Sequence, residues 1–449
     1  MASFNDISEQ MRALGATRII FKALANNDNT KQQIYLGGDF DVIKAIPSGE
    51  IYADGMSKKG AIFKAPLEFY WIDEDGGIDH APNSQIILYP KYPEIRMSGF
   101  LSGTDRKKTI TPRHLMQPPT KDERADRIHV HRYLILGVNH KQIFAYCTSW
   151  DDDLATELKV LIDDGSVKSV ASVFFELPMI GPTSEEKLLA RLKEVYDMGE
   201  IESCRLNSDG DLIPYKAQNG AGYTLEAQFG IIPNGSPDPD FMDWELKAHS
   251  GSVVTLMTPE PNIGMYIERG LKVFLDNYAT RVQETRLDFA SIHRVGELNT
   301  KTSLTLKMEG YDSVRGEITD PEGGLALRDE NGNLAAGWGF AKVIEHWKNK
   351  HSNTCYVTYT ANKASGAIPK YHFGPNVTLG KDTSLMHFLS ALYNTTIYYD
   401  PGINMKFVPN AKGELNWKAK KRNQFRVKWR HIDGLYSNVR SVSLDKAPS

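Results

Sequence analysis

The N-terminal part of the chain alternates short apolar runs with polar turns. Apolar segments recur as TRIIFKAL, QIILYP, RYLILGV and QIFAYCTSW, and turn-forming Gly, Pro, Asn and Asp residues stand between them. Short apolar runs bounded by turn formers are typical of β-strands rather than of helices. The pattern predicts an all-β barrel or sandwich over roughly the first third of the chain.

Two helical patterns follow, and the expected domain boundary lies between them. The segment DDDLATELKVLIDDG (151–165) begins with acidic residues and ends at a glycine, as helices often do. The segment SEEKLLARLKEVYDMG (184–199) also ends at a glycine, and Ser184 is its expected N-cap. We therefore expect an N-terminal domain over 1–165, a linker over 166–182 and a C-terminal domain over 183–449.

The C-terminal domain mixes both kinds of element. Residues 224–230 predict a short helix, residues 242–249 a strand, and residues 339–351 an amphipathic helix. Such mixing indicates an α/β or α+β architecture. We expect a multi-domain protein with an all-β N-terminal part and an α/β C-terminal part.

The composition is that of a folded soluble protein. Hydrophobic residues make up 41% of the 449 positions and charged residues 24%, which argues against extended disorder. The chain shows neither a membrane-length apolar run nor a secretory signal, so we expect a cytoplasmic protein. Its three cysteines, Cys147, Cys204 and Cys355, lie far apart, which argues against a disulfide framework or a cysteine zinc site.

The net charge of −3 hides a basic segment near the C-terminus. Residues 418–430 read KAKKRNQFRVKWR and contain no acidic residue. In a strand, Phe425, Val427 and Trp429 would lie on one side, and the other side would present a row of cations. The row consists of Arg426, Lys428 and Arg430, and it is either a nucleic-acid contact or an ordinary solvated basic face.

The residues with the clearest chemical meaning lie in the segment PDPDFMDWELKAHS. A strand over 242–249 places Glu245 and Lys247 on one face, and a bend after Pro239 would bring Asp240 toward them. Two converging carboxylates form an oxygen site that Mg²⁺ accepts while it retains waters. A neighbouring ammonium would stabilise charge on a phosphodiester, although the alternative is a surface ion pair.

The residues around this segment resemble a known enzyme family. GAGYTLEAQFGIIPN (220–234), followed by PDPDFMDWELKAHS and VVTLMTPEP, is similar to the signature region of the MvaI/BcnI restriction endonucleases. The resemblance implies a PD-(D/E)xK nuclease fold in which Asp240 and Glu245 bind Mg²⁺ and Lys247 is the catalytic lysine. It also suggests that Glu226, in the TLE segment, orients the attacking water, although an exposed helical carboxylate is the alternative. His249 continues the same face, where a structural histidine is the simpler interpretation.

The N-terminal domain bears a separate resemblance. FKALANNDNTKQQIYLGGDF (21–40) and YPKYPEIRMSGFLSGT (89–104) are similar to the DNA-binding pseudobarrel of plant B-three-type transcription factors and EcoRII-type effector domains. In that fold two arms grip the major groove, and Asn, Gln, Arg, Glu and Asp side chains can read base edges. The first arm would contain Asn27, Asp28, Asn29, Lys31 and Gln32, and the second Lys91, Tyr92, Glu94 and Arg96.

Together these resemblances imply a Mg²⁺-dependent type II restriction endonuclease of the IIE kind. It would act as a monomer in a prokaryotic cytoplasm, bind one copy of its double-stranded DNA site in each domain, and be accompanied by a cognate DNA methyltransferase. The expected site is CCWGG. The alternatives are a MutH-like nicking nuclease and a DNA-binding regulator that does not cleave.

Overall fold

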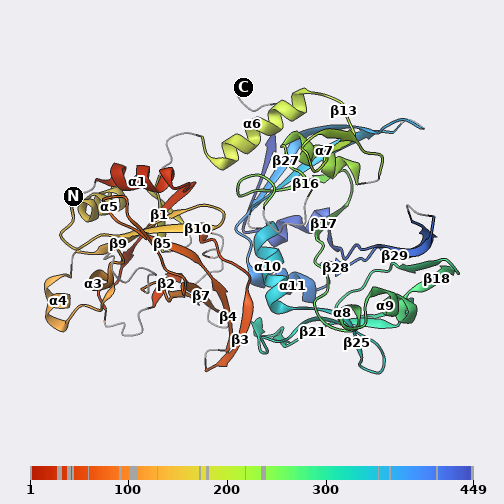
Figure 1. Ribbon diagram of the computed structural model, residues 1–449, viewed down its shortest axis with the longest axis horizontal. Helices are drawn as coiled ribbons and strands as arrows, with labels where there is room; N and C mark the ends of the chain where they lie inside the picture. Colours follow the sequence, from red (N-terminus) through yellow and green to blue (C-terminus); the bar gives the residue numbers. More distant parts are fainter. Residues whose placement is uncertain are drawn as a thin grey trace. The chain divides into compact units, whose positions relative to one another are not determined.

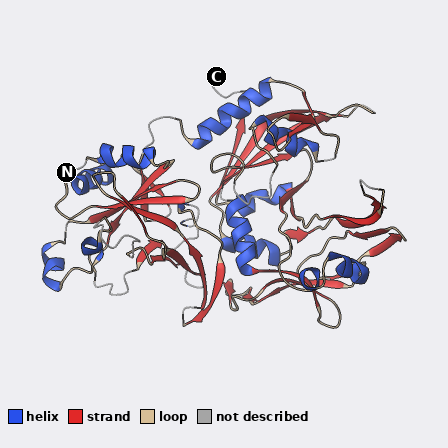
Figure 2. Ribbon diagram, viewed as in Figure 1, coloured by secondary structure: helices blue, strands red, loops and turns tan. Residues whose placement is uncertain are grey.

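The chain divides into two compact units, Met1–Gly181 and Pro182–Ser449, each of which is described by itself (Figure 1). The computed structural model describes residues 3–445, except 28–32, 38–41, 43–44, 59, 91–93, 102–109, 129, 171–172, 178–181, 218, 234–238, 352, 364–365 and 411–412. Both units combine helices and strands (Figure 2), so the protein is a mixed α/β, multi-sheet molecule.

Unit 1 contains two sheets in its described residues. In sheet order, the larger comprises β11 (Lys168–Val170), β12 (Phe174–Glu176), β1 (Arg18–Leu24), β9 (Arg132–Val138), β10 (Gln142–Cys147), β5 (Glu68–Ile72) and β6 (Ile78–His80). The smaller comprises β2 (Ile34–Gly37), β8 (Glu94–Ser98), β7 (Gln85–Tyr89), β4 (Gly60–Pro66) and β3 (Tyr52–Ser57). Only Leu67 separates β4 from β5, so the chain passes directly from one sheet to the other.

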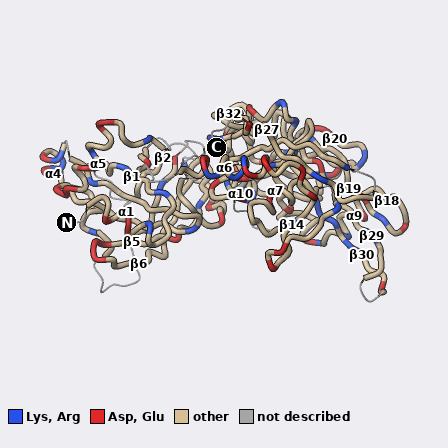
Figure 3. Tube along the Cα trace, turned by 90° about the horizontal axis from the view of Figure 1, so that it is seen from above, with Lys and Arg blue, Asp and Glu red and all other residues tan. Residues whose placement is uncertain are grey.

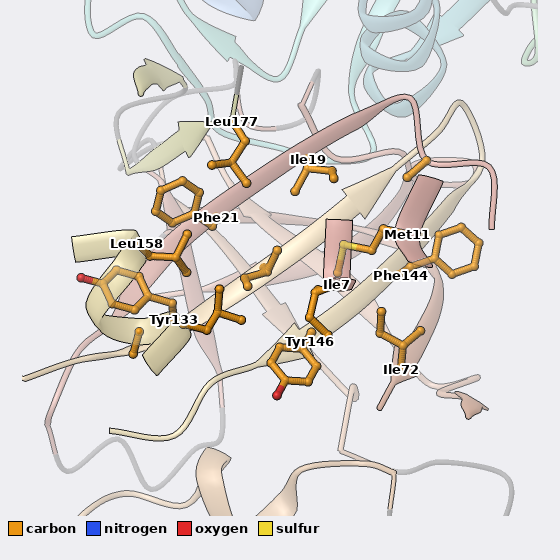
Figure 4. Packing of buried hydrophobic residues seen from close by; sticks show 14 residues of the cluster. Ile7, Met11, Ile19, Phe21, Ile72, Tyr133, Phe144, Tyr146, Leu158 and Leu177 are labelled. Carbon is orange, nitrogen blue, oxygen red and sulfur yellow. The ribbon is translucent and has the colours of Figure 1, made fainter. Parts of the chain in front are cut away.

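Helices cover one face of the larger sheet. The sequence predicts one of them, over 151–165, but it does not predict the helix at the N-terminus. The described helices of unit 1 are α1 (Phe4–Ala13), α3 (Arg113–Met116), α4 (Lys121–Asp126) and α5 (Asp153–Asp163). Ile7 and Met11 of α1 pack with Leu158 of α5 against Phe21 and Tyr133 of the sheet (Figure 4). Side chains four residues apart share a helix face, so α1 buries the stripe that completes this core.

The expected linker differs from the structure. Within residues 166–182, β12 pairs with β1 and places Phe175 opposite Phe21, while β11 pairs with β12. Three-residue strands are too short for an apolar period to show, so the sequence gives no sign of this pairing. The segment therefore belongs largely to unit 1.

A five-stranded sheet forms the centre of unit 2 among the described residues. Its strands run β13 (Ile201–Glu202), β27 (Lys370–Lys381), β26 (Asn353–Asn362) and β16 (Glu245–His249), with β32 (Asn438–Ser443) also paired to β27. Helices α6 (Ser184–Asp197) and α7 (Gly220–Gln228) pack on one face through Leu188, Leu192 and Leu225. Thr183, rather than Ser184, caps α6, in a reciprocal capping box with Glu186.

Smaller sheets complete unit 2. They are β17 (Val253–Met257), β31 (Phe425–Lys428) and β28 (Ile397–Tyr399); β18 (Thr280–Gln283), β19 (Arg286–Phe289), β29 (Ile403–Pro409) and β30 (Leu415–Lys420); β20 (Leu298–Asn299), β21 (Leu304–Glu309), β24 (Gly324–Arg328) and β25 (Leu334–Gly339); β14 (Cys204–Leu206) with β15 (Leu212–Pro214); and β22 (Tyr311–Asp312) with β23 (Glu317–Ile318). The remaining described helices are α8 (Met265–Glu268), α9 (Leu271–Tyr278), α10 (Phe340–His351), α11 (Leu385–Tyr393) and the 3₁₀ helix η1 (Trp429–Leu435).

The described residues also show whether the chain has membrane-spanning helices and what state its cysteines are in. No helix in its described part is both long and apolar enough to span a membrane. The three cysteines are free thiols, of which Cys147 and Cys355 are buried and Cys204 is partly exposed.

Candidate active site

The candidate site is built on β16, at the edge of the central sheet of unit 2. This strand runs parallel to β26, with Glu245 opposite Thr354 and Lys247 opposite Tyr356. Leu246 points into the apolar core beneath α6 and α7. Because successive strand side chains alternate, Glu245 and Lys247 project from the opposite face of the sheet.

A tight turn brings Asp240 to the start of this strand. Phe241 and Trp244 exchange two backbone hydrogen bonds, at 2.9 and 2.8 Å, and Met242 between them has a φ of 55°. The buried indole of Trp244 anchors the turn in the core. The chain thereby folds back, and the Asp240 carboxylate accepts a hydrogen bond of 2.9 Å from the Leu246 amide.

Glu245 and Lys247 form an ion pair in this site. Glu245 is only 2% exposed, and the Lys247 ammonium donates a hydrogen bond to its carboxylate. Burial alone would lower the pKa of Lys247, but the negative charges of Glu245, Asp240 and Glu226 outweigh burial and raise that pKa. The lysine therefore remains a cation at neutral pH.

Glu226 reaches the same region from α7. Its neighbour Leu225 lies in the core between α7 and the sheet, and the Glu226 charge acts on Lys247. Three carboxylates and one ammonium give the site a formal charge of −2.

The donor chemistry fits a hard divalent cation that keeps part of its water shell. Glu245 and Asp240 offer carboxylate oxygens, which Mg²⁺ prefers, and the excess negative charge favours a cation. Among the described residues no group of three or more His, Cys, Asp or Glu side chains is close enough to enclose a metal. The residues that would hold such an ion are Asp240 and Glu245.

A buried polar network lies beside Glu245 on the same face of the sheet, and no pattern in the sequence indicates it. The Tyr436 hydroxyl lies 2.8 Å from the Tyr356 hydroxyl and 2.9 Å from His351 Nδ1, and it donates to Thr354 at 3.0 Å. Burial, followed by the charge and hydrogen bond of Tyr436 and the charge of Glu245, raises the pKa of Tyr356. These residues come from three separate segments, so only the strand register could have revealed them.

His249 lies further along β16 and packs on an aromatic ring. It is 8% exposed, and its imidazole stacks on the Trp429 indole with 4.0 Å between ring centres. Burial lowers the pKa of His249, which favours the neutral ring. The stacking is a packing contact, and the structural role of His249 stays a prediction.

The basic segment does not form a single strand: it covers the end of β30, a connection over 421–424, β31 and the start of η1. The three cations expected to form a row differ in their surroundings. Phe425 and Val427 of β31 are fully buried, as the alternation predicts. Arg426 donates to Asp400 at 2.6 Å, whereas Lys428 is exposed. The strand ends at Lys428, and Arg430 follows in η1, where it is exposed.

In unit 1, several of the expected DNA-reading residues lie outside the described part of the chain. These are Asp28, Asn29, Lys31, Gln32, Lys91 and Tyr92; Asn27, Glu94 and Arg96 are described. Arg96 forms an ion pair with Glu94 and donates to Gln33 at 3.0 Å. The first expected arm covers residues 26–33, so the Arg96 guanidinium links β8 to Gln33 at the end of that arm.

Comparisons with known proteins show what kind of enzyme contains this site. The protein is a site-specific deoxyribonuclease of the restriction endonuclease class. The model of the MvaI/BcnI restriction endonuclease family matches residues 189–436, more than half of the chain, and the chain belongs to this family. A search of curated proteins found no match.

Two solved structures are similar to part of this chain. A complex of restriction endonuclease MvaI with a cognate DNA substrate is 16% identical, with a TM-score of 0.44, over 59% of this chain and 99% of that one. MvaI in the absence of DNA is 14% identical, with a TM-score of 0.32, over 59% of this chain and 100% of that one.

Proposed function

We propose that unit 2 hydrolyses DNA phosphodiester bonds by PD-(D/E)xK chemistry with Mg²⁺ as cofactor. One observation carries this proposal: the carboxylates of Asp240 and Glu245 converge on the Lys247 ammonium on β16, the edge strand of the central sheet. Asp240 and Glu245 would hold the ion. When bound, it would neutralise charge on the scissile phosphate and favour ionisation of an attacking water.

The side chains of the site divide the remaining tasks. Lys247 Nζ stabilises the negative charge that develops on the phosphate oxygens, because its raised pKa keeps it protonated. A carboxylate oxygen of Glu226 accepts a hydrogen bond from the attacking water and orients it. The Tyr356 and Tyr436 hydroxyls, beside Glu245 and Lys247 on the same face of the sheet, hold β26 in register with β16.

Removing one of the two central side chains tests this assignment. We expect Lys247→Ala and Glu245→Ala to lower the cleavage rate on the order of 10²–10³-fold, because each removes an electrostatic contribution to the transition state. DNA affinity should change little, because many phosphate and base contacts elsewhere carry it. The measurements are single-turnover cleavage with Mg²⁺ and binding to the same duplex in EDTA.

The matched control is Lys272→Ala, which removes another ion-paired lysine, on α9. It should cut at the wild-type rate. Cleavage by Lys247→Ala or Glu245→Ala within a few fold of wild type would contradict the assignment. Asp240→Ala should behave like Glu245→Ala, and Glu226→Ala should have a milder effect.

We further propose that unit 1 binds a second copy of the recognition site, which makes the enzyme IIE-like. Direct passage of the chain from β4 to β5 supports a partly closed, pseudobarrel-like arrangement of its two sheets. The Arg96 contact with Gln33 supports a common base for the two expected arms. The proposed site is CCWGG, on the resemblance alone, and a companion methyltransferase would protect host DNA in the same prokaryotic cytoplasm.

A plasmid assay separates this function from the remaining alternative. A type II enzyme gives fixed linear fragments in Mg²⁺ and none in EDTA, whereas a MutH-like enzyme gives nicked circles only. Sequencing of the fragment ends then identifies the site. Fragment ends that do not share CCWGG would refute that site while leaving the nuclease assignment in place.

A further inference from the structure

The sheet formed by β18, β19, β29 and β30 has two chemically different faces. One face carries Met405, Phe407 and Trp417, and the rings of Phe407 and Trp417 lie 5.4 Å apart. Helix α9 covers this face, because the Lys272 ammonium of α9 lies 4.9 Å from the centre of the Trp417 ring. The opposite face of the sheet is therefore the one turned toward solvent.

Cations line up across this solvent face. In the strand register Arg286 lies opposite Lys406, and Lys406 lies opposite Lys418, so three basic residues from three strands form one row. Lys420 lies on the same face, two residues beyond Lys418. Figure 3 shows Lys and Arg in blue near the labels of β29 and β30.

The row is poorly compensated by acidic residues. Arg286 donates to Asp288 at 2.8 Å, so this cation is balanced within its own strand. Lys406, Lys418 and Lys420 are exposed, and none of them has an ion pair with a residue that the structure describes. Like charges placed directly opposite each other destabilise a sheet. This face therefore favours an anion that lies across several strands.

We propose that the cationic face, defined here as Lys406, Lys418 and Lys420, holds the phosphate backbone of the DNA that unit 2 cleaves. This inference rests on the proposed function and adds a contact surface to it. The uncompensated cations are lysines, which act as flexible point charges and do not offer the planar fork with which arginine reads guanine. The contact therefore adds affinity and position without reading sequence.

The salt dependence of binding tests this surface. In full-length protein, Lys406→Ala/Lys418→Ala should lower the slope of log K against log salt by about 1.8, because each lost phosphate contact removes about 0.9. The probes are a duplex of about 30 base pairs with one CCWGG site and the same duplex with the site scrambled, both in EDTA. Affinity should fall by the same factor for both duplexes.

The matched control is Lys187→Ala/Lys193→Ala, which removes two lysines from α6. This helix packs on the face of the central sheet opposite the candidate active site. Its slope should equal that of wild type. An unchanged slope in Lys406→Ala/Lys418→Ala, or a loss confined to the CCWGG duplex, would overturn the inference. If wild-type protein bound neither duplex, the proposed function itself would fail, so the two failures are distinguishable.

Discussion

The position of Glu245 in the sequence predicts part of the site, but not all of it. Its position two residues before Lys247 is enough to place both side chains on one face of a strand, and the structure has that strand. The sequence does not contain the register that sets Thr354 and Tyr356 opposite them, because β26 lies about a hundred residues away. The buried hydroxyl network therefore became visible only in three dimensions.

The Tyr436 hydroxyl can be tested by removing one oxygen atom. In Tyr436→Phe the neighbouring Tyr356, Thr354 and His351 lose a buried partner, which costs about 1–3 kcal/mol of folding stability. Because Thr354 of this network lies opposite Glu245 in the strand register, we also expect the single-turnover cleavage rate to fall about tenfold, which corresponds to about 1.4 kcal/mol in the barrier.

Tyr399→Phe is the control for that prediction. The Tyr399 hydroxyl is also buried and donates to Asn423 at 2.7 Å, in a different sheet. The two variants should lose similar stability in urea unfolding, but Tyr399→Phe should keep the wild-type cleavage rate. Equal cleavage rates in the two variants would show that the Tyr436 network has only a structural role.

Among the elements, the turn before β16 has the greatest effect on the site. The sequence predicts a bend after Pro239 and a strand from residue 242, but the structure places a turn at Phe241–Trp244 and begins β16 at Glu245. The sequence does not indicate this turn, because Met242 is an unusual residue for a positive φ. Other elements were accessible from their patterns, as α6 and α10 show. Helix α1 was missed, although Ser3 and Asp6 form a capping box at its start.

Substitutions at Met242 test the importance of this turn. Met242→Val places a β-branched residue at φ 55°, which costs about 1–3 kcal/mol, and we expect the displaced Asp240 to lower the cleavage rate about tenfold. Met242→Gly accepts this conformation and should cut at the wild-type rate.

Met198→Val is the matched control, because Met198 is similarly exposed but has an ordinary φ of −66° at the end of α6. It should leave both cleavage and the melting temperature nearly unchanged. Wild-type cleavage by Met242→Val would mean that the turn conformation does not position Asp240.

At the scale of the whole molecule, the division into two units determines where the protein can be truncated to give separate fragments. The sequence predicts a boundary near residues 166–182, and along the chain the division falls between Gly181 and Pro182. The pairing of β12 with β1 adds residues up to Glu176 to unit 1, which no local pattern indicates.

Fragments therefore provide a test of the two proposed activities. We expect residues 1–177 to bind a CCWGG duplex without cutting, and residues 182–449 to cut it. A fragment of residues 1–165 lacks β12, exposes the edge of β1, and should unfold at lower urea concentration than 1–177. Binding is measured by fluorescence anisotropy and cutting on labelled duplexes. Absence of DNA binding by 1–177 would contradict the effector role.

The three free cysteines give the enzyme an uneven chemical reactivity. Burial raises the pKa of Cys147 to about 12 and also raises the pKa of Cys355, so neither thiol supplies thiolate at neutral pH. Partial burial also raises the pKa of Cys204, but this thiol, unlike the other two, is partly exposed, and Gln228 of α7 donates to its sulfur at 3.8 Å. A maleimide dye would therefore attach preferentially at Cys204 in the native protein, where it would report movements of the helix that carries Glu226.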